Sequence, residues 1–523
     1  MAERTLSPTS RRLLGAALAA AVLAVFWPAL GGGFFFIDDA RYVAANPDVL
    51  AGLSPRAVAW ALTTRACEYY HPLTWLSLLT DASLFGTGPS GFHFTALLLH
   101  ALNAWLLFEV LLDWGCGAWP SAAAAALFAL HPLRVETAAW ISERKGVLCA
   151  FFVLVALRLY GRARRDRGRN LWPTALAFAL AALSKPAALT LPLALLAVDA
   201  CAYGRPARGR ALAGLVAEKW PLWLIAAAAG AATMAAAAPN MAPPESIPPL
   251  ARLGDPLLAL WTQIAKAVAP RPMTVLDAPL GLIRVVEYTP LRFCALVAGA
   301  ACAGLALRAA RRLWPEGWGG ALWLAALTVP ILGFFRGAMT VVADRYTYLP
   351  HIGLAWAAAG LATRLVRARP RAGRPLAAAA VVGVAVCAVR ARAELVLWTE
   401  PLARWEYAAT LAPESAWARD ELGVELLRAG RRGAAESSLL AATRLDPADA
   451  RALNNLAVAA AEGGRAREAA ALFARAEKLG GGPVAARNAA ALRAPPTGPG
   501  PAFTLMTGSG PLPDAPAAAP TRD

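Results

Sequence analysis

Two adjacent carboxylates open the part of this sequence that is richest in reactive side chains. Asp38 and Asp39 follow a long apolar segment directly, in FFFIDDARYVAANP. Neighbouring carboxylates can divide the work between a base and an orienting group, because their mutual repulsion raises the proton affinity of one of them. One of them could instead bind a cation. The structural alternative is a helix N-cap, or a solvated pair at a membrane surface.

Paired cations stand in a second segment, HPLRVETAAWISERKG. If this segment is helical, Glu136, Trp140 and Glu143 share one face at spacings i, i+4 and i+7. Arg144 and Lys145 follow, at the mouth of the next apolar segment. Two cations in that position favour an anionic ligand, and a lipid-linked phosphate is the natural candidate. Ion pairing with the two glutamates is the structural alternative.

Two further segments carry cations beside apolar blocks. Lys185 lies in LSKPAALTLP, and Asp344, Arg345, Tyr346 and His351 lie in ADRYTYLPHIG. A lysine near a membrane midplane or its rim indicates function, because burying its charge in hydrocarbon is costly. An arginine can bind phosphate through two parallel hydrogen bonds, which a lysine cannot. A local ion pair between Asp344 and Arg345 is the alternative.

Histidines and aromatic residues gather in EYYHPLTWLSLL, which contains His71, and in FHF, which contains His93. They could shape a binding site. They could equally form the aromatic belt that marks a membrane surface.

The elements that must position these residues are membrane helices. The chain has 523 residues, of which 58% are hydrophobic, and its mean hydropathy is +0.47, too apolar for an ordinary soluble protein. Its apolar blocks have roughly the length needed to cross about 30 Å of hydrocarbon as helices. The predicted fold is all-α: a polytopic helical bundle followed by a short helical repeat array. We expect about eleven spans, at 13–33, 92–112, 118–132, 146–160, 171–183, 187–202, 219–238, 290–307, 319–335, 349–366 and 375–392.

The positive charge sets the expected orientation. A formal net charge of +17 would suit nucleic-acid binding, but Arg forms clusters between apolar blocks, which is the positive-inside pattern and also suits contact with anionic lipid. The clusters are Arg162, Arg164, Arg165, Arg167 and Arg169; Arg205, Arg208 and Arg210; Arg308, Arg311 and Arg312; and Arg364, Arg367, Arg369, Arg371 and Arg374. With these inside, the N-terminus is cytoplasmic and the chain after Val396 lies outside. The expected outer loops are 34–91, 133–145, 184–186, 239–289 and 336–348.

The N-terminal apolar run follows Arg11 and Arg12 and could be a signal peptide or an uncleaved anchor. We favour the anchor, because the run continues to about Ile37. Six of the seven cysteines lie in or beside apolar blocks, where a thiol acts as a small hydrophobe, and their spacing predicts neither a disulfide framework nor a metal site.

The C-terminal part repeats itself every 34 residues. Ala412-Pro413 corresponds to Asp446-Pro447, and Leu422-Gly423 to Leu456-Ala457. A 34-residue period with small residues at the helix crossing is the tetratricopeptide pattern. With the change of composition near Glu400, it predicts a membrane domain at 1–398 and repeats at 399–493. The Pro-, Gly- and Ala-rich sequence after Ala494 predicts a disordered tail at 494–523. The helix pairs are 415–429 with 433–445 and 449–462 with 466–479, with a further helix near 484–493. Since two and a half repeats are few for a free solenoid, we expect Glu394 to Leu411 to supply a preceding helix that docks the array on the membrane domain.

The order of these motifs resembles a known family. FIDDARYVAANPDV, YYHPLTWLSLLTD, LFALHPLRVETAAWISERKGVL, LSKPAALTLPLALLAVD and ADRYTYLPHIGLAW, followed by tetratricopeptide repeats, are similar to the transmembrane and tetratricopeptide repeat O-mannosyltransferases and their bacterial relatives. These belong to the GT-C superfamily of membrane glycosyltransferases. The resemblance covers roughly residues 10–480. No nucleotide-binding fingerprint accompanies it, so a nucleotide-sugar held in a Rossmann crevice is not expected.

The resemblance implies an inverting transfer of a sugar, mannose or another hexose, from a polyprenyl-phosphate donor to a hydroxyl of an exported protein at the outer membrane face. It implies a catalytic carboxylate, Asp39 in first place and Asp38 in second. It implies donor-phosphate binding by Arg144, Lys145, Arg345 and Lys185, and a site shaped by His71, His93, Glu136 and Tyr346. The sequence specifies no metal ligand and leaves dependence on a divalent metal open.

Other functions fit part of the pattern. The same donor could serve transfer to a lipid or an envelope glycan, or the membrane part could anchor a non-catalytic repeat scaffold that binds a partner helix. A transporter is disfavoured, because the ionisable residues gather in outer loops and no inverted repeat of the spans is visible. The repeat array is shorter than in animal members of the family, so the protein acceptor is the part of the resemblance that transfers least directly. The Ala-, Arg- and Gly-rich composition points to a bacterial inner membrane.

Overall fold

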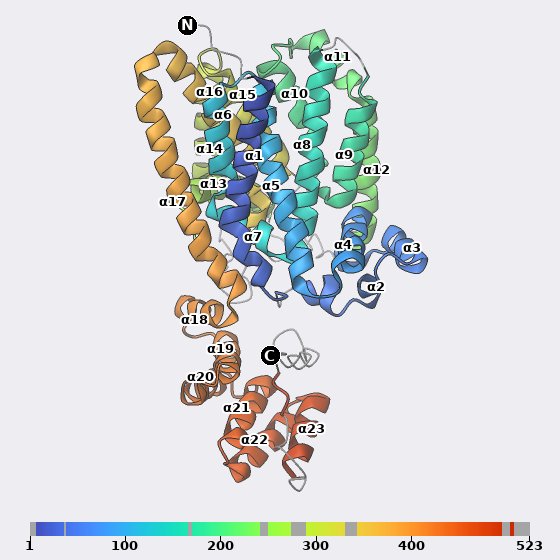
Figure 1. Ribbon diagram of the computed structural model, residues 1–523, viewed down its shortest axis with the longest axis vertical. Coiled ribbons are helices and arrows are strands. Elements are labelled where there is room, and N and C mark those ends of the chain that lie inside the picture. The colour runs from blue at the N-terminus through green and yellow to red at the C-terminus, as the bar shows by residue number, and fades with distance from the viewer. Residues whose placement is uncertain are drawn as a thin grey trace. The chain divides into compact units, whose positions relative to one another are not determined.

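The computed structural model of this chain describes residues 7–35, 38–165, 170–240, 249–272, 289–329, 343–493 and 503–506. Every regular element in these ranges is helical, which confirms the all-α prediction (Figure 1). The chain divides into two compact units, with Thr399 the last described residue of the first and Glu400 the start of the second.

The first unit contains long helices and shorter ones between them. The long helices are α1 (Pro8–Phe26), α5 (Pro89–Asp113), α8 (Arg144–Arg165), α12 (Trp220–Ala237), α13 (Pro249–Val268), α14 (Pro290–Ala310), α16 (His351–Ala368) and α17 (Gly373–Thr399). The shorter ones are α2 (Pro47–Leu50), α3 (Pro55–Thr63), α4 (Pro72–Phe85), α6 (Ala118–Ala129), α7 (Val135–Ala139), α9 (Trp172–Ser184), α10 (Leu191–Cys201), α11 (Gly209–Glu218) and α15 (Pro315–Thr328). Single turns include η2 (Ala40–Ala44), η5 (Ile141–Glu143), η6 (Pro186–Ala188) and η11 (Asp344–Thr347).

Six segments of the described chain are long and apolar enough to cross a membrane. They are Pro8–Gly31, Pro89–Asp113, Ile141–Arg165, Trp220–Ala237, Pro290–Ala310 and Pro370–Thr399, and each contains or overlaps an expected span. The other five expected spans overlap α6, α9, α10, α15 and α16, which are too short or too polar to meet the same criterion. The chain is therefore a multi-pass membrane protein, and the exact number of eleven spans stays a prediction.

The arginine-rich segments meet at one end of this unit. Arg11 of α1 and Arg158 of α8 both bind Glu109 near the end of α5, and Glu218 of α11 binds Arg205 at 2.6 Å. Figure 1 shows the start of α1, the helix α11 and the start of α17 at this end, with α2, α3 and α4 at the opposite end. Such a separation is what the positive-inside pattern requires. Which end faces the cytoplasm stays a prediction.

Helices α15 and α16 pack with their backbones in direct contact. A Cβ on Gly320 would lie against the carbonyl oxygen of Gly353, and a Cβ on Gly353 against that of Gly320. The buried indoles of Trp323 and Trp356 lie beside this crossing, each within ring contact of Trp114. Small residues at a helix crossing allow close approach, which drives helix association where lipid offers no hydrophobic gain.

The second unit is built from helical hairpins. Its helices are α18 (Pro401–Leu411), α19 (Ala416–Arg428), α20 (Arg432–Leu445), α21 (Ala450–Glu462), α22 (Ala466–Lys478) and α23 (Gly482–Arg493). Both members of the second hairpin, α21 and α22, begin 34 residues after their counterparts α19 and α20. The 34-residue period of the sequence thus appears as two helical hairpins in succession. Assignment to the tetratricopeptide class, and docking of the array on the membrane unit, stay predictions.

The ends of these helices show why the sequence folds this way. Ser415 and Asp449, 34 residues apart, cap the N-termini of α19 and α21 by accepting from backbone N–H groups at 3.2 and 2.9 Å. Gly430 and Gly464, also 34 apart, follow the same two helices at φ 71° and 79°, a conformation that favours glycine. The predicted disordered tail lies outside the described residues, except for Phe503–Met506, which contact the repeats.

The close crossing of α15 and α16 gives a stability prediction. Gly320→Ala should lower the free energy of unfolding by about 1–3 kcal/mol, because the added methyl group must displace the backbone of α16. Thermal unfolding of the purified protein in detergent measures the loss. Gly304→Ala in α14 is the control, since nothing lies within 4 Å of its added Cβ. An unchanged Tm for Gly320→Ala would show that the two helices do not approach this closely.

Candidate active site

Asp39 joins the loop after the first span to the segment that precedes α8. Its side chain is fully buried; Oδ2 accepts from the Phe35 N–H at 2.7 Å, and Oδ1 accepts from the Ser142 N–H at 2.9 Å and from the Ser142 hydroxyl. Burial raises the pKa of Asp39 to about 6 although these three hydrogen bonds lower it, and the charge of Asp38 adds to the rise. The contribution of Asp39 to folding stability is therefore full below its usual pKa and is lost as the pH rises through about 6.

Asp38 has a different environment. Its side chain is partly exposed. Within the described part of the chain no hydrogen bond or ion pair engages its carboxylate. Of the two adjacent carboxylates, Asp39 is bound by three donors, whereas Asp38 is partly exposed.

Three of the four cations expected to bind phosphate converge on one buried glutamate. Glu143 lies 3.2 Å from Lys145 Nζ, 2.8 Å from Lys185 Nζ and 3.7 Å from Arg345 Nε. Glu136 accepts a second bond from the Arg345 guanidinium. Both glutamate side chains are 1% exposed, whereas those of Lys145, Lys185 and Arg345 are 8%, 12% and 15% exposed. The two carboxylates are thus more deeply buried than the cations that bind them.

Aromatic rings hold two of these cations from the side. Lys145 Nζ lies 4.5 Å from the centre of the Tyr42 ring, and the Arg345 guanidinium lies 5.3 Å from Trp140 and 4.8 Å from Tyr346. A cation over an aromatic face is attracted to the electron density of the ring. These contacts restrict the rotamers of side chains that would otherwise be mobile.

His71 packs against Tyr42, the ring that contacts Lys145, but takes no part in the cluster of charged side chains. Its ring stacks on Tyr42 and Trp75, with centroids 5.8 and 5.0 Å apart, and it is fully buried. Burial lowers the pKa of His71 to about 3, so the ring is neutral at physiological pH. His93 is also buried and contacts the Gly33 carbonyl at 3.3 Å, which places it under the loop that carries Asp39.

Arg144 does not join the cluster. Its guanidinium lies 2.7 Å from Asp81 Oδ2, with both side chains buried, and donates to Ser77 Oγ at 2.9 Å and to the Phe92 carbonyl. These partners belong to α4 and α5. The structure therefore gives Arg144 the contacts of a residue that fixes the start of α8 against two neighbouring helices.

The expected helical face through Glu136, Trp140 and Glu143 is wrong in its geometry. Trp140 has φ −92° and ψ 116°, an extended conformation that ends α7 and begins the separate turn η5. The two glutamates still meet, because Arg345 bonds to Glu136 and approaches Glu143. Arg345, from a distant segment, brings the two glutamates together. The sequence had predicted that a shared helix would do so.

The local sequence around Lys185 and Arg345 helps to explain the positions of these two cations. Lys185 precedes Pro186, which disfavours the helical region for the residue before it, and Lys185 accordingly ends α9 in an extended conformation at φ −159° and ψ 136°. Asp344 and Arg345 share the turn η11 but form no pair with each other: Asp344 binds Lys266 of α13 at 2.6 Å, and Arg345 binds Glu136.

Sequence reasoning missed Ser142, Lys266 and Asp81. Ser142 lies inside a motif that was recognised, yet its role depends on a partner 103 residues away. Asp81 is the single charged residue of α4, and that rarity is a signal in the sequence, whereas Lys266 shares α13 with Arg252 and Asp255 and is not marked in this way. Among the described residues, no group of three or more His, Cys, Asp or Glu side chains is arranged to hold a metal ion.

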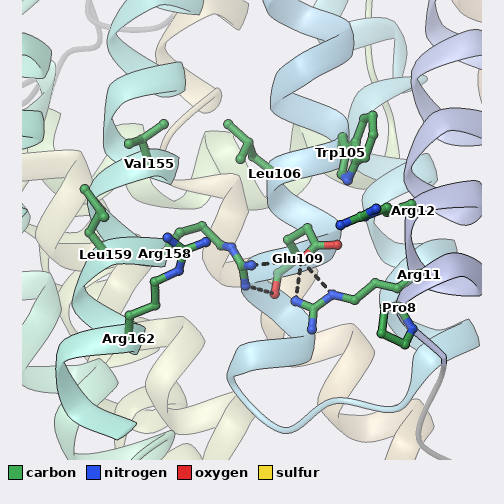
Figure 2. Close-up of a pocket in the computed structure, with 10 residues that line it drawn as sticks. All are labelled: Pro8, Arg11, Arg12, Trp105, Leu106, Glu109, Val155, Arg158, Leu159 and Arg162. Carbon is green, nitrogen blue, oxygen red and sulfur yellow. Dashed lines mark hydrogen bonds and ion pairs between the residues drawn. The ribbon is translucent and has the colours of Figure 1, made fainter. Parts of the chain in front are cut away.

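A groove of about 490 Å³ lies at the opposite, arginine-rich end of the unit. Figure 2 shows Arg11 and Arg158 directed at Glu109, between the helices α1, α5 and α8. The distance from Arg158 Nη2 to Glu109 Oε2 is 3.0 Å. None of the residues expected to act in catalysis lines this groove, so the cluster around Glu143 and Asp38 is the candidate active site.

Comparison with known proteins finds partial, distant similarity. The chain is 30% identical over 162 residues to the protein O-mannosyl-transferase Tmtc1 of Drosophila melanogaster, covering 29% of this chain and 19% of that protein. It is 26% identical over 175 residues to human protein O-mannosyl-transferase TMTC3, covering 31% and 18%, and 30% identical over 156 residues to human TMTC2, covering 28% and 18%. The chain thus spans about a fifth of the length of these relatives. No family profile and no solved structure matches the chain.

The buried pair of Arg144 and Asp81 gives a second stability prediction. Arg144→Met should lower the free energy of unfolding by about 3–5 kcal/mol, because it leaves the Asp81 carboxylate buried without its partner. The double variant Arg144→Met/Asp81→Leu should recover most of that loss, which thermal unfolding in detergent would measure. Arg12→Met is the control, since Arg12 is exposed. Full stability of Arg144→Met would mean that the pair has no structural role.

Proposed function

We propose that this chain is a membrane glycosyltransferase that transfers a hexose, such as mannose, from a polyprenyl-phosphate donor to a hydroxyl of an exported protein, at the outer membrane face. The observation that carries the proposal is the position of Ser142. Its amide and hydroxyl bind Asp39, and its carbonyl accepts a hydrogen bond from Lys145 Nζ at 2.6 Å. One residue thus joins the acidic loop to the cation cluster, which are the two components that such a transfer needs.

The proposed chemistry is a single displacement. A carboxylate takes the proton of the acceptor hydroxyl as its oxygen forms a bond to the anomeric carbon of the sugar. The bond from that carbon to the donor phosphate breaks, and its electron pair stays on the phosphate oxygen. Attack and departure occur on opposite faces, so the configuration inverts. Cations beside the departing phosphate stabilise the charge that develops on it.

Asp38 is the better candidate for the base. The sequence alone favoured Asp39 narrowly, but Asp39 is buried and both of its oxygens already accept hydrogen bonds. Asp38 is partly exposed, and its neighbour holds the loop in place. We therefore assign proton transfer to Asp38 and a positioning role to Asp39.

Lys145, Lys185 and Arg345 are the proposed phosphate ligands. Each is held by a buried glutamate, and the three side chains are 8%, 12% and 15% exposed, more than the 1% of the glutamates. Ion pairs of this kind keep the cations together in the absence of the donor, since unpaired charges would repel one another. We assign Arg144 to structure, and give His71, His93, Glu136 and Tyr346 the task of shaping the site.

The relatives are named protein O-mannosyl-transferases, and the similarity reaches about a fifth of their length. A lipid or envelope glycan is the alternative acceptor, and a non-catalytic repeat scaffold is the alternative function. Location in a bacterial inner membrane rests on composition and stays a prediction.

Substitution of the two acidic residues separates their roles. Asp38→Asn should reduce transfer by about 10²–10⁴-fold, because an amide cannot accept the proton, and it should leave Tm unchanged. Asp39→Asn should alter stability as well, since it replaces an acceptor in a buried hydrogen-bonded junction. The assay is hexose transfer from a polyprenyl-phosphate donor in membrane vesicles, with mass spectrometry of the exported glycoproteins. Full activity of Asp38→Asn with an inactive, stable Asp39→Asn would return the base to Asp39, and full activity of both would refute the proposed site.

The cation cluster is tested in the same assay. Lys185→Met and Arg345→Met should each lower kcat/KM for the polyprenyl-phosphate donor by roughly 10–100-fold, because each removes charge beside the leaving phosphate. Arg12→Met, at the opposite end of the unit, is the control and should transfer normally. Unchanged donor kinetics in both site variants would show that the cations serve structure alone.

A further inference from the structure

The repeat unit contains a ladder of polar side chains that recurs every 34 residues. Asp420, Asn454 and Asn488 occupy the same position in three successive repeats, on α19, α21 and α23, and are at most 1% exposed. Asn488 donates to Asn454 Oδ1 at 2.9 Å, and Asn455 donates to Asp420 Oδ1 at 2.9 Å. Buried carboxamides are costly unless their hydrogen bonds are made, so a row of them needs an occupant.

Asn455 lies beside Asn454 and is counted with the ladder from here on. Together with Asn488 it binds the backbone of the chain's own segment Phe503–Met506. Asn488 donates to the Thr504 carbonyl at 2.8 Å and accepts from the Thr504 N–H at 2.9 Å. Asn455 makes the same pair of bonds to Met506, both at 2.7 Å. A carboxamide presents a donor and an acceptor side by side, which matches the C=O and N–H of one residue. Thr504 and Met506, two residues apart, are thus both held through backbone groups that all residues share.

The side chains of the segment add apolar contacts with the helices α21, α22 and α23. The ladder and these apolar residues together are called the groove below. The Phe503 ring stacks on Phe473 with centroids 6.0 Å apart, and Met506 is 7% exposed beside Leu453. Thr504 is only partly buried. The backbone of Thr504 is therefore held at both polar groups while its side chain remains near solvent.

The ladder also extends one position beyond the bound segment. Asp420 is fully buried, and no residue in the described part of the chain donates a hydrogen bond to its Oδ2. Burial raises the pKa of Asp420 to about 8, so at neutral pH it is mostly protonated and carries a donor and an acceptor, as an asparagine does. An Asp420 Oδ2 that no described residue meets, one repeat before the bound segment, favours a binding site that accepts more than these four residues.

We propose that the Asp420–Asn454–Asn455–Asn488 ladder is a binding site for an extended polypeptide that reads the backbone of its ligand, and that Phe503–Met506 occupies it as an internal competitor. The identification of that ligand as the Ser- or Thr-bearing acceptor rests on the proposed function. Nine residues, 494–502, separate the segment from α23. A short tether of this kind gives a high effective concentration, so a free peptide must compete with the segment for the groove.

Peptide binding to the full-length protein in detergent tests the site. The probe is a fluorescent peptide with the sequence of residues 501–510, PAFTLMTGSG. The variant Phe503→Ser/Met506→Ser removes the apolar anchors of the internal segment and leaves the groove intact. It should bind the probe at least ten-fold more tightly than the parent chain, as measured by fluorescence anisotropy. Thr443→Ala on α20, which is remote from the ladder, is the control and should bind as the parent does.

Backbone recognition has a sharper test that leaves the protein unchanged. A probe methylated on the two backbone nitrogens that correspond to Thr504 and Met506 should bind the Phe503→Ser/Met506→Ser variant at least ten-fold more weakly, because both N–H donors are gone. A probe in which only the threonine side chains are replaced by valine should bind within about three-fold of the original. Equal binding of the methylated and unmethylated probes would overturn the inference.

Adding Asn488→Ala to the Phe503→Ser/Met506→Ser variant should cost at least ten-fold in probe affinity, with hydrogen exchange of α19 and α20 unchanged as the check on folding. The outcomes separate the two proposals. Ladder-dependent probe binding without hexose transfer in any variant, including the parent chain, would refute the glycosyltransferase and leave the groove. Hexose transfer in the parent chain with probe binding that ignores both the tail and the ladder would refute the groove and leave the glycosyltransferase.

Discussion

The candidate site depends on the rule that a buried charge must be paired. Three of the four residues 142–145 bind a partner from a distant part of the chain: Ser142 binds Asp39, Glu143 binds Lys185, and Arg144 binds Asp81. Lys145 donates back to the Ser142 carbonyl. The turn η5 and the start of α8 thus tie together the first loop, the end of α9 and the helix α4. Loss of any one partner leaves a charge or a polar group in a medium that cannot solvate it.

The sequence was informative where residue type alone restricts the possibilities. Charged residues in an apolar chain have few places to go, so Lys145, Lys185 and Arg345 could be expected to gather, and they meet at Glu143. The arginine clusters likewise marked one end of the bundle, because the charge bias of membrane proteins acts on every loop separately. The 34-residue period predicted the two helical hairpins correctly. Helix starts are encoded locally, because each N-terminus has its own capping residue, as Ser415 and Asp449 show.

Contacts between distant segments could not be predicted from the sequence. Nothing in the spacing of Arg144 distinguishes a phosphate ligand from a partner of Asp81, which lies 63 positions earlier. The helix break at Trp140 depends on packing, because the residues around it are compatible with a helix by themselves. The ladder could have been predicted, because Asp420, Asn454 and Asn488 recur every 34 residues in the sequence. The repeat was identified from its apolar and small positions, and these polar positions were not considered.

A groove that reads backbone suits the demand that the proposed chemistry makes on its acceptor. The reacting hydroxyl must be exposed to a base and to a sugar, so a site that gripped the Ser or Thr side chain would block the reaction. Binding through the C=O and N–H of alternate residues leaves side chains available and accepts many sequences. It also requires the acceptor to be extended, because a residue within a helix or sheet has already committed those groups. Polypeptides that have crossed a membrane and have not yet folded meet that requirement. The site would therefore select acceptors by their conformation and by the apolar residues that flank the hydroxyl, as Phe503 and Met506 flank Thr504.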